Sequence, residues 1–251
     1  MATRQLLGDV KFTYDWYEKF LDHLLSEGCD FRTFRQQPAD GSLHLRHDVD
    51  LSLTDALQMA KIEAERGVQS TYCILLSSPL YNPLDGKNAV TIREIEALGH
   101  EIGLHFNTHN YWRPSESPRR ETIETRVRDE RRALEIVTAD LSPAVSFHRP
   151  IPWVLGREFE TFQNTYGPAY FTDIEYFADS NQRWRADPPI VSEIPSPVQL
   201  LTHPGLWADT DGTFEDRIER SVTSACRTVK RRAHEEFIEP QRVNDRDTED
   251  R

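Results

Sequence analysis

Short apolar segments alternate with segments of helical periodicity along most of the chain, and this alternation constrains the fold more than any other feature. The predicted strands cover 42–50, 69–76, 101–106, 144–147, 170–177, 190–194 and 198–202. The predicted helices cover 12–27, 52–65, 92–98, 121–139 and 214–237. Strand–helix–strand alternation predicts an α/β fold with a mainly parallel sheet, either open or barrel-like.

The length of 251 residues fits one large domain, because α/β barrels of about 200–250 residues commonly fold as single units. No internal repeat or low-complexity linker divides the chain. We expect one domain over residues 1–238, with an N-terminal helix at 12–27 and a C-terminal helix at about 213–238. Residues 239–251 hold one aliphatic side chain among charges, which is typical of a disordered polar tail.

The composition argues against nucleic acid and against a membrane as partners. The 42 acidic residues outnumber the 30 basic ones, and a net charge of -12 argues against binding to nucleic acid. Three cysteines without a CxxC pair indicate reduced thiols in a cytosolic protein. The N-terminus has no apolar core of signal-peptide length, and the longest uncharged run, 67–84, contains polar residues and two prolines. We therefore expect a cytoplasmic protein without a membrane span.

Polar side chains gather where the predicted strands end. The clusters are Asp48 with Asp50, His105 with His109, His148 with Arg149, and His203. In open α/β sheets and in barrels alike, ligands bind at the carboxyl ends of the strands. We expect these four clusters to converge on one face of the molecule.

Two of the clusters have spacings that suit a cation. The HxxxH spacing of His105 and His109 places two imidazoles one turn apart, where both could reach one metal ion. Asp48 and Asp50 are two apart on a strand and face the same side, and close carboxylates repel unless a cation or a proton intervenes. The alternatives are polar residues satisfied by hydrogen bonds for the histidines and helix capping for Asp50.

The remaining clusters suit proton transfer. A histidine at the end of an apolar strand, such as His203, is well placed for a general acid, although a structural role is the alternative. His148 and Arg149 could form a surface ion pair. Taken together, one Asp and two His with an open position make a mononuclear metal site, and a second Asp with a distant His supplies a base and an acid.

The eleven residues of Gly99–His109, GHEIGLHFNTH, closely resemble the second motif of the polysaccharide deacetylase family, the NodB-homology group of carbohydrate esterases. The other clusters follow in the order of that family: the aspartates of 48–50, the arginine–proline pair 149–150, and the closing LTH of 201–203. The resemblance covers about 39–207 and implies a distorted, incomplete (β/α)7-type barrel.

The resemblance also implies roles for the site residues. The metal ligands would be Asp50, His105 and His109, and the ion would be divalent, above all zinc. Asp48 would be the general base, Arg149 would hold Asp48 ionised, and His203 would be the general acid. The family has adjacent aspartates, whereas Val49 separates them here in an RHDVD sequence that resembles an intracellular-type branch, so the aspartate that binds metal stays open.

Further residues are candidates for contact with the substrate. They are His148, Asp179, Arg183, Trp184 and Trp207. The two tryptophans could stack on a sugar face or pack in the core. Asp179 and Arg183, together with Asp173, could support the site or lie on the surface.

The predicted function is metal-dependent hydrolysis of a C–N amide bond, first of all deacetylation of an N-acetylated sugar or glycan precursor, the expected partner. One alternative is a hydrolase of a cyclic imide or amide such as allantoin. The other is a non-catalytic carbohydrate-binding descendant of the fold, which would have a broken set of metal and acid–base residues. The set is whole here, and this favours the enzyme.

Overall fold

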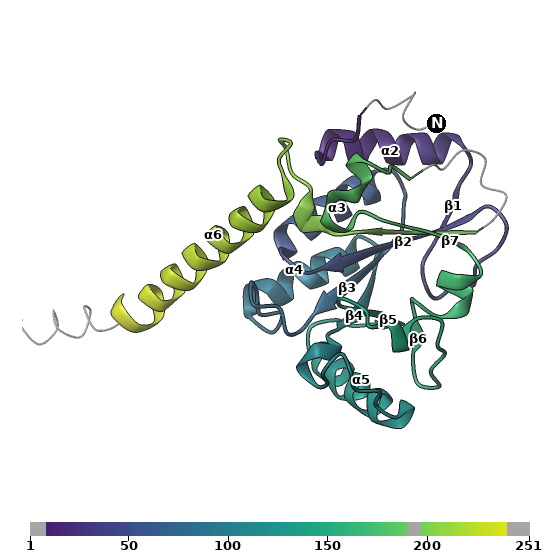
Figure 1. The fold of residues 1–251 in the computed structure, drawn as a ribbon. Coiled ribbons are helices and arrows are strands. Elements are labelled where there is room, and N and C mark those ends of the chain that lie inside the picture. The colour runs from purple at the N-terminus through teal and green to yellow at the C-terminus, as the bar shows by residue number, and fades with distance from the viewer. Residues whose placement is uncertain (1–8, 190–196, 240–251) are drawn as a thin grey trace, which may run out of the picture.

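A curled parallel β-sheet forms the centre of the computed structural model, which describes residues 9–189 and 197–239 (Figure 1). Its strands are β1 Asp30–Arg32, β2 Ser42–Val49, β3 Thr71–Leu75, β4 Glu101–Phe106, β5 Leu141–Phe147, β6 Gln163–Asn164, β7 Glu175–Ala178 and β8 Val198–Thr202. They are ordered β6-β5-β4-β3-β2-β8-β7, with β1 also paired to β2, and every pairing is parallel. The predicted incomplete (β/α) barrel is confirmed.

Helices flank the sheet. They are α2 Tyr14–Ser26, α3 Leu53–Glu65, α4 Gly86–Ala97, α5 Arg120–Leu134 and α6 Phe214–Ala233. Helix α2 begins where the Thr13 side chain accepts a hydrogen bond from the Trp16 amide, and it buries an apolar stripe that includes Phe20 and Leu24. Helix α6, by contrast, extends away from the rest of the domain (Figure 1). None of the helices in the part of the chain described here is long and apolar enough to cross a bilayer.

Strand β2 lies in the middle of the sheet, between β3 and β8. All eight of its residues are buried. Leu43 and Leu45 pack in the core cluster that includes α2, while Arg46 and Asp48 alternate with them and so lie on the opposite face of the sheet. A strand buried on both faces belongs to a sheet covered on both sides. The polar residues of β2 therefore need partners inside the protein, and these partners build the site.

The structure differs from the predicted elements in a few places. The strand predicted at 170–177 is split, because Pro168–Thr172 forms a helical turn and only Glu175–Ala178 pairs with β8. Pro168 lacks an N–H group and suits the first position of such a turn. The short strands β1 and β6 carry too few residues for a periodic pattern. The strand predicted at 190–194 and the tail predicted at 239–251 lie outside the described residues, apart from Glu239.

A buried carboxylate, Glu63 of α3, ties several elements together. It accepts hydrogen bonds from Tyr17 at 2.6 Å, Ser70 at 2.6 Å and Tyr72 at 3.1 Å. Its Oε1 lies 2.8 Å from Nε2 of His47, whose Nδ1 lies 2.6 Å from the hydroxyl of Thr202. The network thus joins β2, next to Asp48, to the end of β8.

Replacing Glu63 with glutamine is expected to lower the free energy of unfolding by about 3–5 kcal/mol, because a buried charge network loses its anion. Burial raises the pKa of Glu63, but the charge and hydrogen bond of His47 outweigh this effect and lower the pKa to about 2. The carboxylate therefore stabilises the fold fully above its ordinary pKa of 4.5, and this stabilisation is lost as the pH falls toward 2.

Urea denaturation at pH 7 and at pH 3 measures both effects. The control is Glu65→Gln, because Glu65 lies exposed on the same helix and its change should cost less than about 0.5 kcal/mol. Equal stability of the two variants at pH 7 would contradict the structural role of Glu63.

Candidate active site

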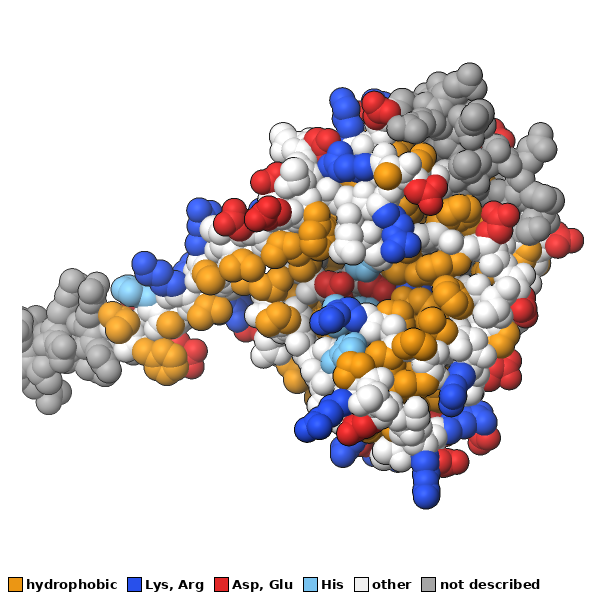
Figure 2. Space-filling view, in the orientation of Figure 1, with side chains coloured by type: hydrophobic (Ala, Val, Ile, Leu, Met, Phe, Trp, Pro, Cys, Tyr) orange, Lys and Arg blue, Asp and Glu red, His pale blue; other side chains and the backbone are white. Residues whose placement is uncertain are grey.

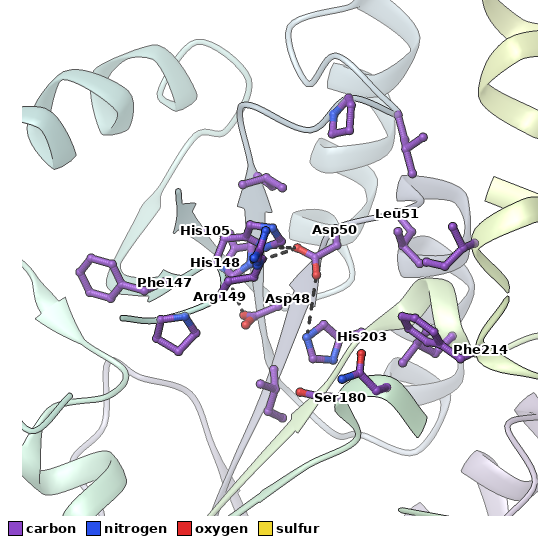
Figure 3. A pocket seen from close by; sticks show the side chains of 18 of the residues that line it. Asp48, Asp50, Leu51, His105, Phe147, His148, Arg149, Ser180, His203 and Phe214 are labelled. Carbon is purple, nitrogen blue, oxygen red and sulfur yellow. Dashed lines mark hydrogen bonds and ion pairs between the residues drawn. The ribbon is translucent and has the colours of Figure 1, made fainter. Parts of the chain in front are cut away.

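A cavity of about 470 Å³ opens at the carboxyl ends of the central strands (Figure 3). The polar residues that line it include Asp48, Asp50, His105, His148, Arg149 and His203. These residues come from the ends of β2, β4, β5 and β8, or from just beyond them. The structure therefore brings all four clusters to one face, although His109 does not line the cavity.

Asp50, His105 and His148 form a triangle of possible metal ligands (Figure 3). Asp50 Oδ1 lies 3.1 Å from His105 Nε2 and 3.0 Å from His148 Nδ1, and the two nitrogens are 3.2 Å apart. Ligands of a tetrahedral zinc at 2.0–2.1 Å lie about 3.3 Å from one another, so the triangle fits such an ion. Asp50 Oδ1 is also buried without a regular hydrogen-bond donor among the described residues.

The residue His148, a candidate for substrate contact in the sequence, thus stands where His109 was expected. His109 lies in a 3-10 turn, Thr108–Asn110, and its Nε2 is 3.2 Å from the carbonyl oxygen of Arg149. His148 follows β5, which pairs with β4 so that His105 is opposite Ser146. A histidine just beyond the end of the neighbouring strand is the signal that could have identified it.

Asp48 is held by a buried guanidinium from its own strand. The Arg46 Nη2 donates to Asp48 Oδ2 at 3.2 Å, the Arg46 Nε lies 3.2 Å from Oδ1, and the Ser146 hydroxyl donates to Oδ2 at 2.9 Å. Burial raises the pKa of Asp48, but the positive charge of Arg46 outweighs burial and lowers it. Asp48 is therefore ionised at neutral pH and able to accept a proton.

The sequence assigned this supporting role to Arg149, whereas the structure places Arg46 beside Asp48. Arg46 and Asp48 are two apart on β2 and so share a face, which is the signal that could have found Arg46. Arg46 is also fixed by hydrogen bonds to Thr165, Tyr166 and Gln199. Arg149 is instead exposed at the mouth of the cavity, with a left-handed φ of 48°.

His203 is paired with a buried carboxylate. Its Nδ1 donates to Asp179 Oδ1 at 2.6 Å, and Asp179 Oδ2 accepts from the His203 amide and from the indole of Trp207, both at 3.0 Å. Burial lowers the pKa of His203, but the charge and hydrogen bond of Asp179 outweigh burial and raise it to about 9. His203 is therefore protonated at neutral pH.

The opposite ring nitrogen of His203 faces the proposed metal site. Its Nε2 lies 3.9 Å from Asp50 Oδ2 (Figure 3). The turn after His203 contains Gly205, where a Cβ would lie 2.5 Å from the Cβ of Leu51. Only glycine permits this close approach, which brings the turn after β8 against Leu51, the residue that follows Asp50.

The other candidates for substrate contact lie away from the cavity. Trp184 and Trp207 are 1% and 0% exposed and pack in the core cluster that includes α2, so stacking on a sugar does not fit their positions. Arg183 and Asp173 are exposed but do not line the cavity. The sequence did not indicate the apolar wall of the cavity, which is formed by Leu51, Leu80, Leu206, Phe214 and Ile218.

Comparisons with known proteins give weak similarities. No protein-family model and no curated protein matches the sequence. Among solved structures, the chain is similar to a family 4 carbohydrate esterase from Bacillus anthracis, with 13% identity over 85% of this chain and 86% of that one, at a TM-score of 0.42. A family 4 acetyl xylan esterase from Clostridium thermocellum, solved with a cobalt ion, shows 14% identity over 76% and 84% of the two chains, at a TM-score of 0.41.

A CE4 family pseudoenzyme from Bacillus anthracis is also similar, with 12% identity and a TM-score of 0.40. The match covers 74% of this chain and 60% of that protein, so this chain corresponds to less than two thirds of its length.

Proposed function

We propose that the protein is a metal-dependent hydrolase of a C–N amide bond and that it deacetylates an N-acetylated sugar or glycan precursor. One observation carries this proposal: an ionised carboxylate, Asp48, and a protonated imidazole, His203, face the same cavity as Asp50. Groups whose pKa values are pushed apart in this way serve as base and acid in the same reaction.

Asp50, His105 and His148 would hold a divalent metal ion, which we propose to be zinc. When bound, such an ion polarises an acyl carbonyl and acidifies a water molecule. His105 suits this role because its Nδ1 lies 3.1 Å from the Ser146 hydroxyl, which leaves Nε2 free for the ion.

The protein's own residues would move the protons. Asp48 would accept the proton of the attacking water, and Arg46 keeps this carboxylate ionised and oriented. His203 would donate from Nε2 to the departing amine, because Nδ1 is bound to Asp179. Asp179 both orients the ring and stabilises its positive charge, so acid and base hold the correct protonation states at neutral pH before substrate binds.

The cavity suits a small polar substrate with one apolar side. Its volume of about 470 Å³ lies in the usual range for small-molecule sites. Charged residues and apolar side chains both line the cavity, so a sugar ring can place its hydroxyl groups toward the first and a C–H face toward the second. We propose the cytoplasm as the place of reaction, supported by three cysteines that are all free thiols.

Replacing Arg149 with alanine is expected to raise KM by about tenfold and to leave kcat within about twofold, because the loss of one charged contact weakens binding uniformly. Alanine retains the cost of the left-handed backbone, so the change isolates the guanidinium. Steady-state kinetics measure this, with the exposed Arg183→Ala as the control. A fall in kcat at unchanged KM would instead support the role that the sequence suggested, in which Arg149 acts on Asp48.

The function itself is tested by product analysis. Purified protein is incubated with zinc and with N-acetylhexosamines, free and nucleotide-linked, and released acetate and free amine are measured with and without a chelator. Chelator-sensitive acetate release supports the proposal. Ring opening of allantoin without acetate release would favour the cyclic amide alternative, and glycan binding without any product would favour the non-catalytic descendant.

A further inference from the structure

Helix α6 exposes an apolar face. Of its twenty residues only Arg217 and Ser221 are buried. The α6 stripe consists of Phe214, Ile218, Val222, Ala225, Val229 and Ala233. Val222 is 42% exposed and Val229 is 67% exposed, and Figure 2 shows hydrophobic side chains running along this helix toward the middle of the molecule. A continuous exposed apolar face of this kind marks a surface for interaction with another molecule.

The pattern of the α6 stripe is symmetric. Its spacings are 4, 4, 3, 4 and 4 residues, which place the stripe on one side of the helix and read the same from either end. Two copies of α6 packed antiparallel about a two-fold axis would therefore match: Phe214 meets Ala233, Ile218 meets Val229, and Val222 meets Ala225. A two-fold interface requires such a self-complementary surface.

The charges of α6 also favour antiparallel pairing. The acidic residues Glu215, Asp216 and Glu219 lie near its start, and the basic residues Arg227 and Lys230 lie in its second half. Arg231 and Arg232 lie there too, but they pair with Glu235 and Asp85 of the same chain. An antiparallel pair places the acidic end of one helix beside the basic end of the other, whereas a parallel pair would oppose like charges. An acidic end also disfavours an anionic lipid surface, which attracts helices with a basic polar face.

Two arginines in the acidic half do not cancel this pattern, because they are bound to their own chain. Arg217 donates to the carbonyl oxygens of Leu206 and Phe12. Arg220 donates to the carboxylate of Asp55 at 2.7 Å. The outward charge of the first turns of α6 therefore comes from the acids.

We propose that α6 pairs antiparallel with α6 of a second copy of this chain, so that the protein is a homodimer. Phe214 and Ile218 belong both to the α6 stripe and to the wall of the cavity. The end of the second α6 therefore lies beside the cavity and closes part of its apolar side. This inference does not depend on the proposed reaction.

Sedimentation velocity of the full chain from 1 to 100 µM tests the dimer. We expect the wild type to dimerise, and we expect its dissociation constant to rise more than tenfold in Val222→Glu and in Val229→Glu. Both side chains are exposed, so the variants should fold, which circular dichroism verifies. The control is Thr223→Glu, exposed on the opposite side of the helix. A wild-type monomer at 100 µM, or glutamate variants that dimerise like wild type, would overturn the proposal.

Disulfide formation tests the direction of pairing. Chains with Val222→Cys are mixed with chains with Ala225→Cys, both carrying Cys226→Ser to remove the exposed thiol. Antiparallel pairing predicts mainly the mixed disulfide, and disulfides only between like chains would overturn it. Flotation of a monomeric protein with vesicles of phosphatidylcholine and phosphatidylglycerol would also overturn it, because lipid would then cover the α6 stripe.

Discussion

Replacing Asp48 with asparagine is expected to lower kcat by about 10²–10⁴-fold while the protein retains its metal ion. The amide cannot accept the proton of the attacking water, whereas the proposed ligands Asp50, His105 and His148 are unchanged. The measurements are kcat at saturating substrate and metal content of the same preparation by mass spectrometry.

The variant needs a control for stability, because it leaves the charge of Arg46 buried without its carboxylate partner. Thermal unfolding of the variant sets the temperature of the assay, which must lie well below its midpoint. Ser146→Ala removes one hydrogen bond to Asp48 and the hydroxyl beside His105 Nδ1 but leaves the carboxylate, so it should lower kcat by less than about tenfold, with metal content measured alongside. Asp48→Asn with full metal content and unchanged kcat would rule out Asp48 as the base.

Replacing His148 with alanine is expected to weaken metal binding by more than the roughly 100-fold that loss of a supporting residue costs, and activity should fall with it. The reason is geometric, since His148 Nδ1 lies 3.0 Å from Asp50 Oδ1 and 3.2 Å from His105 Nε2. Competition with a chromophoric chelator measures the affinity for zinc.

His109→Ala is the matched control, because it removes an imidazole four residues after His105 that lies beside a backbone carbonyl in the structure. This variant should bind zinc with nearly the affinity of the wild type. If His109→Ala loses the metal and His148→Ala retains it, the ligand set is the one that the HxxxH spacing suggested, and the triangle of the structure is not the metal site.

Most of the elements, and the face on which the polar clusters meet, can be predicted from the sequence. Strands such as β2, β4 and β8 and the helices α2 and α3 follow from local spacing of apolar residues, because burial repeats with the period of the element. The convergence of Asp48, His105 and His203 follows from parallel strands, whose carboxyl ends share one edge. Neither step requires knowledge of which strands are neighbours.

Which residues meet within the site depends on which strands are neighbours, and this order is not contained in the sequence pattern. His148 meets His105 because β5 pairs with β4, and the turn after β4 directs His109 to the carbonyl of Arg149. Strand order is a tertiary property that the HxxxH spacing does not contain. Arg46, in contrast, could have been recognised from the alternation of β2, which puts it on the same face as Asp48.

The burial of Trp184 and Trp207 illustrates a second limit. The sequence left stacking on a sugar face and packing in the core open for both tryptophans, and the packing of α2 against them decides that they belong to the core. A large aromatic residue near a functional motif is compatible with stacking or with core packing, and only the three-dimensional neighbours distinguish the two.

The most direct test of the central claim couples metal content to turnover. The protein is stripped with a chelator and titrated with zinc while acetate release from an N-acetylhexosamine substrate is followed. We predict that activity is absent without metal, rises linearly, and saturates at one zinc per chain. Acetate release that persists in the stripped protein, or zinc binding at one equivalent that survives the combined loss of His105 and His148, would contradict the proposed metal centre.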